Sequence, residues 1–181
     1  MFEISFFFNR KCPKLTKYWR GILCFRVWSR FQSCFHTVRR IQWIPKQLFQ
    51  LSYIENLYLD NNNLELLPDK FFEKLPQLKY LDLRNNELSE IPSLGLENHK
   101  NLQVLLLSRN SITQLPLKLG FVKSLNALHW IGNPIEFPEM SVLEQSNDEM
   151  KKGMRKLYRE RLNEEPLKQE KVEAQLITQN K

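Results

Sequence analysis

The apolar residues of this chain follow one pattern that returns every 23 or 24 residues. Each copy has leucine or isoleucine at positions one and four, a further apolar residue at position six, asparagine at position nine and a proline at its end. Four clear copies begin at Ile54, Leu78, Leu102 and Leu125. A fixed period of about 20–29 residues, with leucines in this order, predicts a solenoid of stacked repeats.

The spacing within each copy predicts one short strand. Leu57 and Leu59 are separated by one residue, so both side chains point to one face of an extended strand while Tyr58 points to the other. A single repeat cannot bury its own leucines, so the repeats stack and their strands lie side by side. We therefore expect an α/β fold: a leucine-rich-repeat solenoid with a parallel β-sheet on its concave face and a C-terminal capping helix.

The asparagines at position nine form a column in the stacked repeats, made of Asn62, Asn86, Asn110 and Asn133. The chain turns at this position and leaves strand-end backbone groups that need partners. A side-chain amide both donates and accepts, so each asparagine can bond to groups in its own and in the adjacent repeat. Loss of one asparagine is expected to cost about 1–3 kcal/mol, because buried groups lose their partners.

A degenerate repeat is predicted before the first clear copy. Its second half has apolar residues at Ile41, Ile44, Leu48 and Leu51. Its strand half would occupy residues 31–39, where Cys34 and His36 replace leucines and Arg39 replaces the asparagine. A strand is therefore doubtful in this segment.

A helix is predicted after the fourth copy, where the repeat pattern stops. Ser146-x-x-Glu149 is a capping-box pattern. A stripe at helical spacing follows, with Met150, Met154, Leu157 and Tyr158. We expect this helix to close the end of the solenoid, with a break of the pattern at Pro166 and a frayed helix or a tail over residues 167–181. The predicted organisation is an N-terminal extension (1–39), the repeats (40–138), a C-terminal cap (139–165) and a charged tail (166–181).

Charge and cysteine are distributed unevenly along the chain. Residues 1–54 carry ten Lys or Arg and one acid, whereas residues 55–181 carry 17 Lys or Arg and 19 Asp or Glu. The repeats are therefore not a basic surface of the kind that binds nucleic acid. Cys12, Cys24 and Cys34 all lie in the extension, at spacings that match no zinc motif. Repeats without cysteine favour a reducing, cytoplasmic location over secretion.

The N-terminal extension allows several interpretations. Between Lys14 and Phe25, apolar and basic residues fall on different faces of a short helix. This fits a membrane-surface helix, a calmodulin-like target or an organelle presequence. The alternatives are a poorly ordered extension, aromatic residues that cover the open end of the solenoid, or the product of an alternative first exon.

The sequence contains no recognisable motif for catalysis. His36, His99 and His129 have no Cys, Asp or Glu at metal-ligand spacing. There is no glycine-rich phosphate loop, and no Ser or Cys lies in a nucleophile motif. We therefore expect a protein that is not an enzyme and that uses no metal or cofactor.

Three runs resemble intracellular leucine-rich-repeat proteins of the 23–24-residue class: LPDKFFEKLPQLKYLDLRNNELSEIP, NLQVLLLSRNSITQLPLKLGFVKSLNAL and GNPIEFP. The resemblance covers about residues 41–160 and implies non-catalytic protein binding without a defined partner. FQSCFHTVR replaces the earliest strand of the family. The long charged C-terminal region of such proteins is missing after Lys181, so a short isoform or a fragment is expected.

The outward-pointing side chains of the strands form the predicted contact surface. The predicted contact residues are Tyr58, Asp60, Tyr80, Asp82, Arg84, Val104, Leu106, Ser108, Arg109 and His129, and Asn56, Ala127 and Ile131 share the face. Tyrosine and arginine are frequent at binding hot spots. Nothing in the predicted fold needs Val104 or Leu106 to be apolar, which also favours binding. Four strands offer only roughly a few hundred Å2, less than the ~800 Å2 per partner of a stable interface. A partner must therefore also use the flank or an end, or bind weakly.

The leading hypothesis is an intracellular, monomeric scaffold or adaptor that binds a protein partner and no nucleic acid. One alternative is an adaptor that residues 1–39 direct to a membrane or an organelle. Another is a regulatory subunit that presents an enzyme to its target.

Overall fold

The computed structural model describes residues 41–179 of the 181-residue chain, with side chains described as far as residue 163 except that of residue 47. Short helices and strands alternate along the chain, and the short 3-10 helices are labelled η. In chain order the elements are η1 (Lys46–Gln50), β1 (Asn56–Tyr58), α1 (Phe71–Lys74), β2 (Tyr80–Asp82), η2 (Leu96–Asn98), β3 (Val104–Leu106), η3 (Leu117–Phe121), β4 (Ala127–His129), α2 (Met140–Leu143) and α3 (Asn147–Gln179).

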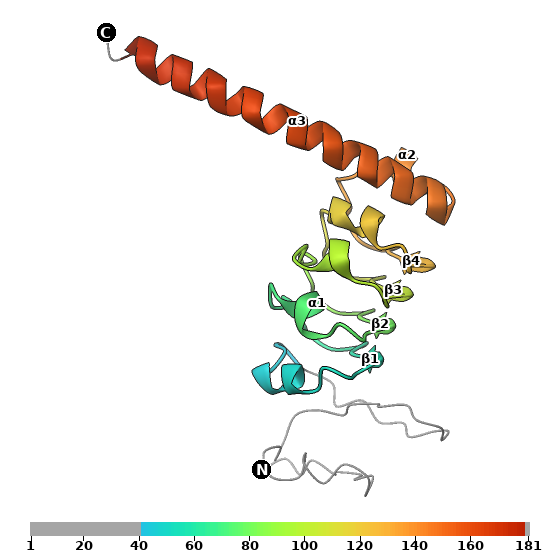
Figure 1. Ribbon diagram of the computed structural model, residues 1–181. Helices are drawn as coiled ribbons and strands as arrows, with labels where there is room; N and C mark the ends of the chain where they lie inside the picture. The colour runs from blue at the N-terminus through green and yellow to red at the C-terminus, as the bar shows by residue number, and fades with distance from the viewer. Residues whose placement is uncertain (1–40, 180–181) are drawn as a thin grey trace, which may run out of the picture.

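The four strands form one parallel sheet in the order β1-β2-β3-β4. Equivalent residues of successive repeats pair with each other, so Leu81 of β2 lies between Leu57 of β1 and Leu105 of β3. Figure 1 shows the strands stacked along one side of the solenoid and the short helices along the other. The predicted α/β solenoid with a parallel sheet is confirmed.

The interior of the solenoid is a ladder of leucines with an aromatic cluster behind it. Leu81, Leu83 and their equivalents in the neighbouring repeats are almost completely buried. Each such side chain contributes about 1.5–3 kcal/mol through the removal of apolar surface from water. Behind the ladder, Phe71 and Phe72 of α1 pack edge to face with ring centroids 5.4 Å apart. The leucine period did not reveal these two residues, because they lie in the more variable return segment.

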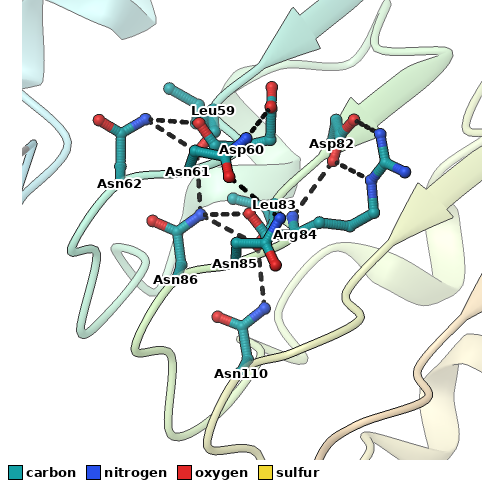
Figure 2. A network of polar contacts seen from close by, with 10 residues as sticks. All are labelled: Leu59, Asp60, Asn61, Asn62, Asp82, Leu83, Arg84, Asn85, Asn86 and Asn110. Atoms are coloured by element: carbon teal, nitrogen blue, oxygen red, sulfur yellow. Dashed lines mark hydrogen bonds and ion pairs between the residues drawn. The ribbon is translucent and has the colours of Figure 1, made fainter. Parts of the chain in front are cut away.

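The position-nine asparagines bond across repeats as expected (Figure 2). The Asn86 side chain accepts the Leu64 N–H at 3.1 Å, and it donates to the Leu59 and Leu83 carbonyls at 2.9 and 3.0 Å. Asn110 makes the same three contacts one repeat later, with the Leu88 N–H and the Leu83 and Leu107 carbonyls. Each asparagine therefore satisfies backbone groups of two successive repeats at once.

His99, in the second repeat, bonds to backbone groups of the first and third repeats on the helical side of the solenoid. Its imidazole is buried, with Nε2 3.1 Å from the Leu75 carbonyl and Nδ1 3.1 Å from the Leu102 N–H. A carbonyl can only accept, so Nε2 carries the proton and Nδ1 is the acceptor. The ring is therefore neutral, and burial lowers the pKa of His99 below its ordinary value of 6.5.

The described chain begins within the degenerate repeat. The predicted apolar residues Ile41, Ile44, Leu48 and Leu51 are all buried. The Ile41 N–H donates to the Asn62 side chain at 3.2 Å, as the Leu64 N–H does to Asn86. The second half of this repeat is thus confirmed. Its strand half and all predictions for the N-terminal extension lie outside the described residues.

The long helix α3 covers the C-terminal end of the solenoid, as the helical stripe predicted (Figure 1). Met150 and Met154 are buried against the last repeat, and Leu157 and Tyr158 pack on the same core while partly exposed. Tyr158 also meets Phe121 edge to face, with centroids 5.3 Å apart. The apolar stripe therefore serves the core of the protein.

Polar side chains of α3 bond to carbonyl groups at the end of the last repeat. Asn147 and Lys151 both donate to the Leu125 carbonyl, at 2.8 and 3.0 Å, and Arg155 donates to the Gly120 carbonyl. A Cβ at Gly120 would lie 2.8 Å from the Lys151 carbonyl oxygen, so only glycine allows this close approach. The helix thus supplies donors that the next repeat would otherwise provide.

The break expected at Pro166 does not end the helix, because α3 continues to Gln179, in agreement with the helical alternative for this segment and not with a tail. Proline removes one helical hydrogen bond and strains the preceding turn. Residues 167–179 are rich in leucine, lysine, glutamine and glutamate, which favour helix on the far side of that break. The proposed division between cap and tail at residue 165 stays a prediction.

Replacing Leu83 by Ala is expected to lower the free energy of unfolding by about 2–5 kcal/mol, because it leaves a cavity in the middle of the ladder. Chemical denaturation measures this change. Leu66→Ala is the matched control, since the Leu66 side chain is 54% exposed and its loss should cost less than about 0.5 kcal/mol. Equal losses in the two variants would contradict a core centred on the leucine ladder.

Acid is expected to destabilise the protein through His99. The folded pKa lies below the unfolded value of 6.5, so the unfolded chain binds more protons between these two values. The contribution of His99 to the free energy of unfolding is therefore fully present above pH 6.5. It falls as the pH drops toward the folded pKa. His99→Gln should flatten this part of the stability profile, whereas His129→Gln, at an exposed position, should keep it. A wild-type slope in the His99→Gln profile would refute this role.

Candidate functional site

The concave face of the sheet carries the outward side chains of the four strands in three columns. The strand register and the backbone bonds that follow each strand define them. The first column is Asn56, Tyr80, Val104 and Ala127, the second is Tyr58, Asp82, Leu106 and His129, and the third is Asp60, Arg84, Ser108 and Ile131. All the predicted contact residues except Arg109, which lies in the turn after β3, therefore lie on one face.

An aromatic pair lies at the β1–β2 end of the concave face. The rings of Tyr58 and Tyr80 are tilted by 37° with centroids 5.1 Å apart, and both side chains are half-buried. Burial, and then the charge of Asp82, raise the pKa of the Tyr80 phenol. The pair therefore presents aromatic surface, with the Tyr80 phenol held in its protonated form. Asp60 follows Tyr58 by two residues and is half-buried. It accepts a hydrogen bond from the Asn61 side chain at 2.5 Å.

Asp82 and Arg84 form a bidentate ion pair in the middle of the face (Figure 2). Arg84 donates through Nε to Oδ1 at 2.9 Å and through Nη2 to Oδ2 at 2.6 Å. The hydrogen bond to Asp82 raises the pKa of Arg84. Asp82, a predicted contact residue, is only 2% exposed, so its side chain offers a partner almost no surface in this structure. Arg84 covers it and remains partly open to solvent.

Leu106 is 6% exposed, which corrects a second expectation. The sequence prediction gives no structural reason for an apolar residue here, but Leu106 lies between Asp82 of β2 and His129 of β4 and is buried within the fold itself. Leu106 therefore belongs to the structure of the sheet. Val104, at the start of the same strand, is half-buried and offers part of its surface.

The C-terminal end of the concave face is the most open part. His129 and Arg109 are exposed and Ser108 is half-buried. Ile131 is 74% exposed, more than any other large apolar side chain among the described residues. The sequence predicts that Ile131 shares the face but does not mark it as a contact residue, because its exposure depends on the end of the sheet and not on the repeat pattern.

The turn before each position-nine asparagine adds a further column that the sequence interpretation overlooked. Asn61, Asn85, Arg109 and Gly132 all have a positive φ, between 55° and 82°. The signal was present in the sequence, since asparagine and glycine are the residues that most readily adopt left-handed backbone. In this column, Asn85 donates to the Asn61 side chain at 3.1 Å, which extends the polar surface beside the strands.

Two shallow hollows lie away from the concave face. One, of about 360 Å3, lies between α1 and the segment around η2, next to His99, and includes Phe72 and Gly95. The other, of about 270 Å3, lies between the flank of the second to fourth repeats and α3. Its walls include Lys118, Tyr158 and Arg161, and the Arg161 guanidinium lies 5.6 Å from the Phe137 ring centroid. Both are open depressions on the flank.

The described residues hold no cluster of three or more His, Cys, Asp or Glu side chains that could bind a metal ion. Within the same part of the chain, no helix combines the length and the apolar character that crossing a membrane requires. The groups on the concave face are aromatic, amide, guanidinium, carboxylate and apolar groups, which suit contact with another molecule.

Residues 52–112 match the Leucine rich repeat family. A solved structure of a leucine-rich-repeat protein from Leptospira interrogans is similar, with 30% sequence identity and a TM-score of 0.51. The match covers 58% of this chain and 26% of that one, so the chain spans about a quarter of the Leptospira protein. The BIR2 ectodomain of Arabidopsis thaliana is 25% identical with a TM-score of 0.46, over 55% of this chain and 65% of that one. No curated protein matches the chain.

The period, the parallel sheet, the asparagine column, the family match and the similarity to the Leptospira protein agree with one another. The repeats of this chain form a leucine-rich-repeat solenoid.

Proposed function

We propose that this protein is a non-catalytic interaction module that binds a protein partner through its concave face. The observation that carries the proposal is the row of accessible aromatic and apolar side chains on a rigid sheet, from Tyr58 and Tyr80 through Val104 to His129 and Ile131. Leucine-rich-repeat folds generally serve as protein–protein interaction modules. Rigid aromatic side chains are favourable contacts because little entropy is lost when they are covered.

The accessible part of the face is smaller than the predicted contact surface. Asp82 and Leu106 are buried, so they contribute to the structure of the face and offer almost no contact surface. The side chains that we propose as contacts are Tyr58, Asp60, Tyr80, Arg84, Val104, Ser108, Arg109, His129 and Ile131. Strands of three residues at a spacing of about 4.8 Å give this face roughly a few hundred Å2.

A stable interface needs a further contact area, because it buries about 800 Å2 per partner. The flank next to α3, with the exposed Arg161 and the half-buried Tyr158, offers such an area. Helix α3 also runs out beyond the solenoid (Figure 1). A chain with a binding face and a projecting helix suits a scaffold or adaptor, and we propose this role.

Several finer hypotheses stay predictions. We propose that the chain is related to leucine-rich repeat-containing protein 27, which the three quoted runs resemble, and that it is a cytoplasmic monomer. Targeting to a membrane or organelle by residues 1–39 and a role as a regulatory subunit are the alternatives. A fusion of residues 1–39 to a fluorescent protein tests the targeting hypothesis. Diffuse fluorescence would exclude targeting by this segment.

The binding proposal is tested with the double variant Tyr80→Ala/His129→Ala. Proteins captured by the full-length wild-type chain from its native tissue are quantified by mass spectrometry and compared with those captured by the variant. We expect the specific partner to be lost at least about tenfold, because two hot-spot contacts commonly contribute more than 1.4 kcal/mol together. Arg84 is left intact, since its removal would leave the buried Asp82 carboxylate without its partner and destabilise the fold.

A matched control carries Gln77→Ala and Lys100→Ala, two exposed positions on the helical side of the solenoid. Its capture should equal that of the wild type, and thermal unfolding should confirm that both variants are folded. Partners that are retained by the concave-face variant, or lost equally in both variants, would refute the concave face as the binding surface.

A further inference from the structure

Arg109 departs from the residues that occupy the same position in the other repeats. The backbone at this position is left-handed throughout, with φ of 58° at Asn61, 55° at Asn85, 59° at Arg109 and 82° at Gly132. Asparagine and glycine tolerate this conformation, whereas a longer side chain is less favourable there. The backbone therefore gives no reason for an arginine, and the reason lies with its side chain.

The Arg109 guanidinium is a cation without a partner in the described part of the chain. Two other cations of the repeats are paired, Arg84 of the concave face with Asp82 at 2.6 Å and Lys79, just before β2, with Glu55 at 2.9 Å. Arg109 is exposed and forms no ion pair with any of residues 41–163. Its five donors are therefore available to an acceptor from outside.

The surroundings of Arg109 add an apolar contact. Gly132 lies beside Arg109. A Cβ at Gly132 would be 3.2 Å from the Arg109 Cγ, so the absence of a side chain at Gly132 leaves room for the arginine side chain. The Arg109 N–H donates to the Ile131 carbonyl at 3.0 Å, which places the 74% exposed Ile131 in the adjacent repeat. A free guanidinium and an open apolar side chain are thus neighbours at this end of the face.

The opposite charge lies at the other end of the face. Asp60 belongs to the first repeat and is half-buried, and it forms no ion pair among the described residues. Arg109 belongs to the third repeat, two strand spacings away, or about 10 Å. An extended chain covers this distance in about three residues. The face therefore carries a negative group at Asp60 and a positive group at Arg109, and a short extended segment with the opposite charges can pair with both.

We propose that Arg109 and Ile131 form a subsite for an extended segment of a protein partner that carries a carboxylate next to an apolar side chain. The inference rests on the proposed binding function and adds the chemistry of the partner. The carboxylate of an Asp or Glu pairs with the Arg109 fork while the apolar neighbour covers Ile131. A basic residue about three positions away along the segment faces Asp60.

The probe is a displayed library of random peptides of about twelve residues, selected against the full-length wild-type chain. The selected peptides should be enriched in an acidic residue adjoining Leu, Ile, Val or Phe. Their affinity, measured by fluorescence anisotropy, should fall about tenfold for Arg109→Asn, because a charge-assisted hydrogen bond is lost at a partly exposed site. Asparagine is the residue that two other repeats carry at this position, so the variant should fold.

Two further variants serve as controls. Arg159→Gln removes the same charge from an exposed position on α3 and should leave the affinity unchanged. Arg109→Lys keeps the charge without the bidentate fork and should lose less affinity than Arg109→Asn.

The outcomes separate this inference from the proposed function. Selected peptides that need Tyr80 but bind equally to the wild type and to Arg109→Asn would overturn the subsite and leave the binding function in place. A loss of affinity in Arg159→Gln as large as in Arg109→Asn would show only a general charge effect and would also overturn the subsite. A library without any binder to the full-length chain would contradict both.

Discussion

The side-chain amide of the position-nine asparagine is the contact on which the rest of the solenoid depends. Each strand has only three residues, too few for its ladder bonds alone to hold it in place. Asn110 accepts the Leu88 N–H and donates to the Leu83 and Leu107 carbonyls, so one side chain ties three backbone groups from two repeats. These groups are buried, and a buried group without a partner costs about 1–3 kcal/mol.

The properties of the concave face follow from these asparagine hydrogen bonds between repeats. Repeats held in the same register place equivalent outward residues in columns, which is why Tyr58 and Tyr80 meet and Arg84 can close over Asp82. The residue before each asparagine must take a left-handed backbone to aim the amide inward, and this turn sets the direction of Arg109. The arrangement of the candidate binding surface thus follows from the hydrogen bonds that the asparagines make to buried backbone groups.

Much of this arrangement could be predicted from the sequence, because every repeat solves the same packing problem. The leucine positions, the asparagine column and the buried Met150–Met154 stripe are all matched by the structure. Accessibility on the face could not be predicted in the same way. Asp82 and Leu106 occupy outward positions, yet they are covered because their exposure depends on the size and charge of neighbouring side chains. The continuation of α3 past Pro166 reflects helix formers on both sides of one missing hydrogen bond.

The central claim is that the asparagine amides couple the repeats, and amide hydrogen exchange in Asn110→Ala tests it most directly. The account predicts that the Leu88 N–H, which loses its acceptor, exchanges much faster than in the wild type, and that the free energy of unfolding falls by about 1–3 kcal/mol. The Leu64 N–H, which is bonded to Asn86, should change less. Wild-type protection of Leu88 together with unchanged stability would contradict the account.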